Sequence, residues 1–263
     1  MTHTNNIDDM LQEGFSRKFA TYFLNGIKSE DQLGVFDEDY AQWAHSQGFF
    51  ATHAYSYGLT PDNVDDYLSD YDYYKIWPIN SWSRIWINDK LTLKYMLYGT
   101  KYDALMPEYY FYSSNAGLKP LMDIRFAGGC NSLEDVFLSV LQEKKLFACK
   151  PNNGTESRGF VKLSYSDGTY YINDAAASGN QIIEFVRSNP NYLFTEYIVP
   201  SAFFSKFSSQ IHTLRVVTVN ECGTNPRIVA AFLRFPNSTS GAANYNVLRR
   251  IQRKSIICIQ ISI

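Results

Sequence analysis

The chain lacks the features that direct a protein to a membrane or to a nucleic acid. No apolar run approaches the length of a membrane span. Residues 1–10 are polar and acidic, without the apolar core and basic flank of a secretory signal. The formal net charge is -2, and no basic run occurs before the C-terminal tail. We therefore expect no transmembrane segment, no nucleic-acid partner and a cytoplasmic location.

Cysteine and histidine are scarce and dispersed. The four cysteines stand at positions 130, 149, 222 and 258, and none belongs to a CxxC pair, so we expect reduced thiols. The four histidines, at positions 3, 45, 53 and 212, lack the spacing of metal ligands. We therefore expect neither zinc chemistry nor a Ser-His-Asp type of site.

Aromatic residues, in contrast, are abundant at 16% of the 263 residues, and near the N-terminus they recur at helical spacing. This pattern predicts an amphipathic helix over about residues 9–27, weakened at its end by Gly26, and a shorter helix around Tyr40. Thr60 and Pro61 predict the start of a further helix. The buried face of that helix would comprise Val64, Tyr67 and Leu68.

After this helical region the pattern alternates between helices and strands, which predicts an α+β fold. Helices are predicted for residues 90–98, capped by Asn88 or Asp89, for residues 132–142, capped by Ser132, and around residues 182–186. Strands are predicted for residues 106–112, 146–150, 160–163, 169–172, 192–199, 213–219 and 227–235. Turn signals join two pairs of these strands into antiparallel hairpins.

The most informative stretch spans residues 146–163. A buried strand ends at Lys150-Pro151, a polar loop lies between Gly154 and Gly159, and a second strand follows. Glycines permit positive φ and let backbone N–H groups approach an anion, and a lysine beside such a loop suits phosphate binding. A simple β-hairpin with a polar turn uses the same residue types, so both interpretations stay open.

Three further basic residues stand at positions that need an explanation. Arg215 shares a strand face with Val217, and a buried guanidinium needs an anion or a carboxylate partner. Arg234 poses the same question on the next strand, and a salt bridge to a neighbouring acid is the alternative. Lys90 opposes the helix dipole at its helix start, which hints at a role in a cleft, whereas a solvated pair with Lys94 is the simpler interpretation.

The order of these segments resembles that of an ATP-grasp domain. The resemblance rests on Lys150-Pro151 with its glycine loop, residues 194–199, residues 213–218, and residues 230–234 followed by Asn244. It covers roughly residues 66–247, and it is strongest toward the sugar-transfer-associated ATP-grasp proteins found with bacterial capsule and exopolysaccharide genes. It implies two α+β subdomains with ATP between them, after a helical N-terminal region.

The implied division has five parts: a helical region (1–65), a first subdomain (66–145), a lid and adenine-hinge subdomain (146–200), the start of a C-terminal subdomain (201–247) and an atypical tail (248–263).

The resemblance also implies how ATP would be bound. Lys150 would contact the α- and β-phosphates and approach the adenine, and Lys90 would correspond to the nucleotide-binding lysine of the family's first subdomain. The loop from Gly154 to Gly159 would close over the phosphates and exclude water. The adenine hinge would be formed by the backbone of Glu196, Tyr197 and Ile198.

The implied reaction joins a carboxylate to an amine. The carboxylate attacks the γ-phosphate of Mg²⁺-ATP, and the amine captures the acyl phosphate. Arg215 would stabilise the transferred phosphoryl group, and Arg234 with Asn244 would line the site of a small-molecule, sugar-linked acceptor. Two alternatives stay open: a non-catalytic module that binds a nucleotide or a glycan, and a small-molecule kinase.

The tail departs from the family pattern. ATP-grasp domains bind Mg²⁺ through an acidic residue and a later Glu-x-Asn segment, whereas residues 248–263 contain no acid and are first basic and then rich in isoleucine. We therefore expect a truncation or frameshift product with its metal ligands missing and with little or no turnover. A genuine edge strand is the alternative, and such an isoleucine-rich strand would be prone to aggregation.

Overall fold

The computed structural model describes residues 6–80, 83–123, 130–154, 158–234 and 259–261. The chain divides into two compact units. The described part of the first unit lies within residues 6–83, and that of the second comprises residues 84–234 and 259–261.

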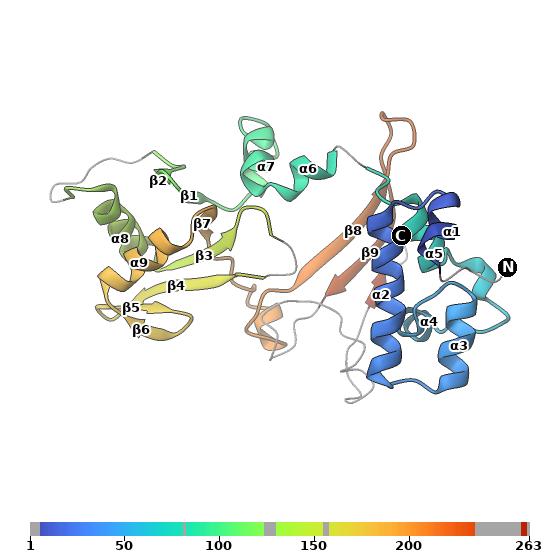
Figure 1. Cartoon of the computed structure of the whole chain (residues 1–263). Coiled ribbons are helices and arrows are strands. Elements are labelled where there is room, and N and C mark those ends of the chain that lie inside the picture. Colours follow the sequence, from blue (N-terminus) through green and yellow to red (C-terminus); the bar gives the residue numbers. More distant parts are fainter. Residues whose placement is uncertain (1–5, 81–82, 124–129, 155–157, 235–258, 262–263) are drawn as a thin grey trace. The chain divides into compact units, whose positions relative to one another are not determined.

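The first unit is built from helices (Figure 1). They are α1 (Ile7–Gln12), α2 (Arg17–Leu33), α3 (Glu38–Ser46), α4 (Ala51–Tyr57), the 3-10 turn η1 (Val64–Asp66) and α5 (Asp70–Ile76). Two apolar clusters hold them together: Met10, Phe15, Ala20, Phe23, Phe50 and Tyr71 in one, and Ala44, Phe49, Ala51, Ala54, Leu59 and Val64 in the other. The helix predicted around Tyr40 is confirmed as α3.

The single helix predicted over residues 9–27 is wrong, because the chain breaks into α1 and α2. Gly14 adopts φ +105°, and the Ser16 side chain caps α2 by accepting from the Phe19 amide. Gly26 does not end a helix but lies inside α2, where a Cβ atom would come within 2.5 Å of the Phe50 ring. The glycine is therefore needed for close packing.

The helix predicted to start at Thr60 is also wrong. The Asn63 side chain accepts a hydrogen bond from the Thr60 amide at 2.8 Å, and only the short turn η1 follows. Val64 is buried as expected, but Tyr67 and Leu68 are exposed. A local side-chain turn replaces the helix here, and helices α4 and α5 were not predicted.

The second unit is mixed, with antiparallel strands, so the expected α+β class is confirmed. It begins with α6 (Ser83–Asn88), α7 (Lys90–Leu97) and the turn η2 (Asp103–Leu105). Its seven-stranded sheet has the order β2 (Gly117–Pro120), β1 (Tyr109–Ser114), β7 (Tyr192–Glu196), β3 (Leu146–Pro151), β4 (Val161–Ser166), β5 (Thr169–Ile172) and β6 (Ala175–Ala177) (Figure 1).

One face of this sheet carries the main core. Helices α8 (Leu133–Lys144) and α9 (Gly179–Ser188) bury their apolar residues in one cluster with the sheet. Phe137 of α8 lies at the centre, with its ring 5.0 Å from those of Phe111 and Phe194. Because side chains alternate along a strand, the residues between these core positions point to the opposite face.

Most predicted elements of this unit are confirmed. Asp89 caps α7 and Ser132 caps α8, as predicted. Ser178, which was not predicted as a cap, caps α9, and the caps of α8 and α9 are both capping boxes. The hairpin of β4 and β5 is present, with Asp167 and Gly168 at positive φ in its two-residue turn. The strand predicted for residues 192–199 ends earlier, at Glu196. Helix α6 and strands β2 and β6 were not predicted.

A second, three-stranded sheet has the order β10 (Ile259–Ile261), β9 (Arg227–Arg234) and β8 (Thr213–Val219). The predicted hairpin of β8 and β9 is confirmed, with a register shift between Val217 and Thr218. Strand β10 lies in the tail and pairs antiparallel with β9, so a strand does occur in this segment. A short turn, η3 (Phe204–Lys206), precedes β8.

Candidate functional site

The end of β3 places Lys150 on the face of the sheet opposite α8 and α9. Phe147 and Cys149 point into the core, and Lys150, one residue further, points the other way and lies beside Leu193 of β7. Its side chain is partly buried, and burial lowers the pKa of its ammonium. The positive charge of Lys90 lowers this pKa further.

No carboxylate balances this charge within the described residues. The charged or ionisable groups that act on Lys150 there are the Lys90 ammonium and the Cys149 thiol. Two lysines thus stand close together without an acid paired to Lys150, which makes the end of β3 electropositive and suited to an anion.

Lys90, at the start of α7, is engaged differently from Lys150. Its ammonium donates to the carbonyl oxygens of Pro151 (2.9 Å), Asn152 (3.0 Å) and Gly154 (3.0 Å). Burial lowers the pKa of Lys90, and the charge of Asp89 partly opposes this effect. Lys90 therefore fastens the start of the glycine loop to α7.

The side chain of Asn152 also bonds the start of the loop to α7. Its side chain is buried, its Oδ1 accepts from the Leu91 amide at 2.8 Å, and its Nδ2 donates to Asp89 at 2.8 Å. Its own amide donates to the Asn191 carbonyl at 2.8 Å, in the turn before β7. The loop start is thus tied to both α7 and the neighbouring strand.

The two predicted loop glycines have structural reasons to be glycine. Gly159 adopts φ +74°, and a Cβ atom there would lie 2.7 Å from the Tyr192 hydroxyl and 2.9 Å from the Pro151 ring. The Tyr192 hydroxyl donates to the Gly159 carbonyl at 3.0 Å. Gly154 faces the Pro151 ring more loosely, at 3.2 Å. Residues 155–157, the middle of the loop, lie outside the described residues.

The predicted adenine hinge follows β7. Glu196 pairs with Phe147, so in this antiparallel pair it lies toward the other end of β3 from Lys150. Tyr197 approaches the loop, because its ring centroid lies 6.3 Å from that of Phe160, the residue after Gly159. Ile198 is exposed.

Arg215, predicted to act on the transferred phosphoryl group, and Arg234, predicted to line the acceptor side, lie on the second sheet. Arg215 is exposed on β8, where the residues from Thr213 to Thr218 are all exposed, so the expectation that it is a buried charge in need of a partner is wrong. Arg234 is half-buried at the end of β9. Asn244 lies outside the described residues. Lys90, Lys150, Gly154 and Gly159 are therefore the predicted residues that the described contacts bring together.

Metal ligands are not grouped in the described part of the chain, where no cluster of three or more His, Cys, Asp or Glu residues could hold an ion. Asp89 is the carboxylate bonded to the loop start, and it accepts from Thr92, Asn152 and Asn153. Every helix within the described ranges is too short or too polar to span a bilayer.

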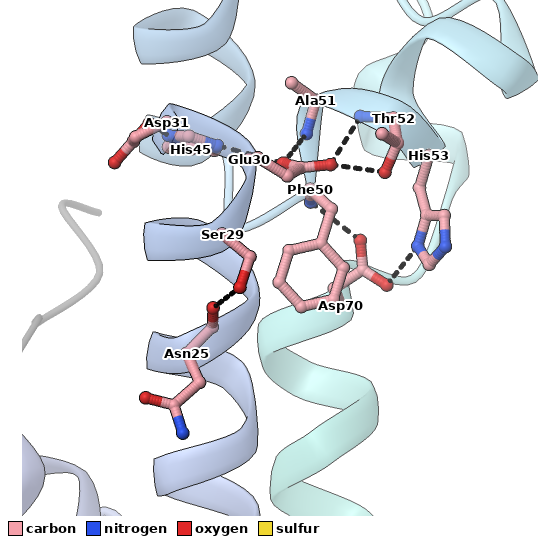
Figure 2. Close-up of polar contacts among 10 residues, drawn as sticks. All are labelled: Asn25, Ser29, Glu30, Asp31, His45, Phe50, Ala51, Thr52, His53 and Asp70. Carbon is pink, nitrogen blue, oxygen red and sulfur yellow. Dashed lines mark hydrogen bonds and ion pairs between the residues drawn. The ribbon is translucent and has the colours of Figure 1, made fainter. Parts of the chain in front are cut away.

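The first unit also contains a buried polar network that was not predicted from the sequence (Figure 2). Helix α4 follows Phe50, which offers no capping side chain, and Glu30 of α2 replaces the cap. Its carboxylate accepts from the amides of Ala51 (2.7 Å) and Thr52 (2.9 Å), and also from the Thr52 hydroxyl. His45 of α3 adds a fourth contact at 3.2 Å.

Burial by itself would raise the pKa of the Glu30 carboxyl. The hydrogen bonds from His45 and from the start of α4 outweigh burial and hold this pKa below its ordinary value of 4.5. The four contacts also occupy the acceptor positions of the carboxylate, so Glu30 joins three helices and has no free position for a ligand.

Asp70 of α5 completes the network. It accepts from the Phe50 amide at 2.8 Å and contacts His53 Nδ1 at 2.7 Å. The hydrogen bond to Asp70 raises the pKa of His53, although burial opposes the effect. No motif of neighbouring residues predicts these partners, because Phe50 and His53 are 20 and 17 residues away from Asp70 in the sequence.

A pocket of about 710 Å³ opens beside this network. Glu30, Asp31 and Glu38 contribute carboxylates to its lining, together with His45 and Phe36, and no Lys or Arg is among the lining residues of the described chain. This charge disfavours a phosphate, so the pocket does not compete with the end of β3 as an anion site.

Comparison with known proteins finds no match for this chain, neither among protein-family models nor among curated proteins nor among solved structures.

Proposed function

We propose that the chain binds the phosphates of ATP at the end of β3, with Lys150 as the contacting cation. The observation that carries this proposal is the partly buried Lys150 ammonium, which has a neighbouring lysine and no carboxylate paired to it within the described residues. A phosphate would supply the missing negative charge through a charge-assisted hydrogen bond.

The surroundings support this choice. The Lys90 contacts hold the loop start beside Lys150, and positive φ at Gly159 lets the backbone turn where a side chain would clash. The contact of Phe160 with Tyr197 brings the segment after β7 toward the loop, where a base would follow the phosphates. These features agree with the ATP-grasp resemblance of the sequence.

The finer part of the proposal is an ATP-grasp ligase that joins a carboxylate to an amine through an acyl phosphate, with an acceptor linked to sugar transfer. Mg²⁺ would neutralise phosphate charge in such a reaction. The described carboxylate beside the loop, Asp89, is engaged as a helix cap, so the described residues do not form a magnesium site. The proposed step is therefore nucleotide binding, with Lys150 orienting the phosphates.

The test is calorimetric titration of the full chain and of Lys150→Ala with Mg²⁺-ATP. We expect binding by the unchanged chain and an affinity at least about tenfold lower in the variant, because a charge-assisted contact is lost. Lys119→Ala removes an exposed lysine from β2 and should bind like the unchanged chain. Equal affinity in the chain and Lys150→Ala, or no binding by the unchanged chain, would contradict the proposal.

A further inference from the structure

We infer that Lys90 is a positioning residue of the phosphate site: it fastens the chain after β3 and leaves the Lys150 ammonium free for the ligand. This inference rests on the proposed function and assigns to α7 a role that differs from direct phosphate binding.

The donor capacity of Lys90 is already used. An ammonium has three N–H donors, and three carbonyl oxygens at 2.9, 3.0 and 3.0 Å accept from it. A phosphate that reached Lys90 would have to displace at least one of these carbonyls. Each displaced carbonyl would need a new donor in a partly buried place.

The start of α7 is likewise closed to an anion. The Leu91 amide donates to Asn152 Oδ1, and the Thr92 amide donates to Asp89 Oδ1, both at 2.8 Å. These are N–H groups that a helix start otherwise offers to a phosphate. Helix α7 therefore acts on the site through the loop start and not through its own first turn.

The same contacts explain why Lys150 remains available. The carbonyls of Pro151, Asn152 and Gly154 lie at the end of β3 and just after it, and Lys90 donates to all three. The positive charge of Lys90 also repels the Lys150 ammonium. Asp89 is bonded to Asn152 and Asn153 and does not pair with Lys150. The arrangement thus engages Lys90 in the structure and leaves Lys150 without a partner among the described residues, available to a ligand.

Two variants of the full chain, Lys90→Met and Lys150→Met, separate positioning from contact. Hydrogen exchange of the Leu91 and Asn152 amides is measured by NMR without ligand, and Mg²⁺-ATP affinity is measured by calorimetry. In Lys90→Met we expect both amides to exchange about tenfold faster or more, and ATP affinity to fall about tenfold. In Lys150→Met we expect the affinity to fall at least as far while both amides exchange as before.

A second readout does not depend on local order. With the positive charge of Lys90 removed, the pKa of the Lys150 ammonium should rise, and NMR titration of that group measures the change. Should Lys90→Met fail to fold, Lys90→Arg serves instead. The planar guanidinium of arginine keeps the positive charge but cannot direct three N–H groups at the same carbonyls. The Leu91 and Asn152 amides should therefore again exchange faster.

Loss of ATP affinity in Lys90→Met with unchanged exchange would make Lys90 a direct ligand and overturn the inference. Unchanged exchange and unchanged affinity would overturn it as well. If the unchanged chain binds no ATP, the proposed function fails, and the exchange comparison still decides whether Lys90 fastens the loop.

Discussion

Glu30 is a buried side chain that caps a helix whose own sequence provides no capping residue. Helix α4 has no capping side chain of its own, and the Glu30 carboxylate from α2 accepts from its first amides (Figure 2). The carboxylate is about nine-tenths buried, with 10% of the side chain exposed, so its hydrogen bonds act at low dielectric. We therefore expect this residue to matter for folding rather than for catalysis.

The first prediction is that Glu30→Gln lowers the free energy of unfolding by about 1–3 kcal/mol at neutral pH, because charged acceptors are lost and an amide N–H₂ faces other donors. Urea unfolding, followed by far-UV circular dichroism, measures the difference. Glu38→Gln changes an exposed carboxylate at the start of α3, is the matched control and should change the stability little.

The difference should depend on pH in a defined direction. The pKa of Glu30 is lowered in the folded state, so its contribution is fully present above the ordinary value of 4.5. It is lost as the pH falls below 4.5 through the folded pKa. The unchanged chain and Glu30→Gln should therefore converge in stability in acid, and a gap that widened there would refute the capping role.

Helix α8 shows what a local pattern determines at the scale of an element. The Ser132 hydroxyl accepts from the Asp135 amide at 3.1 Å, and the Asp135 carboxylate accepts from the Ser132 amide at 2.9 Å. The apolar residues that follow, including Phe137, face the sheet. The cap and the periodicity agree, which is why this helix was predicted with its correct start.

The second prediction is that Ser132→Ala destabilises the second unit by about 1 kcal/mol through loss of the helix cap. Ser139→Ala is the control, because Ser139 is exposed in the middle of the same helix and alanine is the better helix former there. Denaturant titration of both variants measures the difference. Equal stability of the two would show that the cap contributes nothing.

The whole molecule consists of two units with separate apolar clusters. Phe23 is buried in the first and Phe137 in the second. A chain with separate cores is expected to open locally, one unit at a time, rather than in a single step.

The third prediction concerns Phe137→Ala, which should destabilise the second unit by about 3–5 kcal/mol because it leaves a cavity in the core. Hydrogen exchange followed by mass spectrometry should show faster exchange over residues 130–196, with the helices of the first unit unchanged. Phe23→Ala should give the reciprocal pattern. Faster exchange across both units in either variant would mean that they unfold together.

The sequence by itself determined the elements whose signals are local. Asp89 and Ser132 mark two helix starts, Pro151 marks the end of β3, and Asp167 lies in a turn that joins two strands. Each of these signals acts within a few residues, so periodicity and capping were enough to find them. Lys150 and the loop glycines were proposed from a local pattern as well, and their role in binding stays a prediction.

Only the tertiary structure decided the rest. Gly26 packs against Phe50, Glu30 caps α4, and Lys90 reaches carbonyls about 60 residues further along the chain. These contacts join segments that are far apart in the sequence, so a pattern of neighbouring residues does not predict them. Local propensity therefore determined most helices and strands, whereas long-range hydrogen bonds and packing decided how α4 is capped, why Gly26 stands inside α2 and how the loop start is bonded to α7.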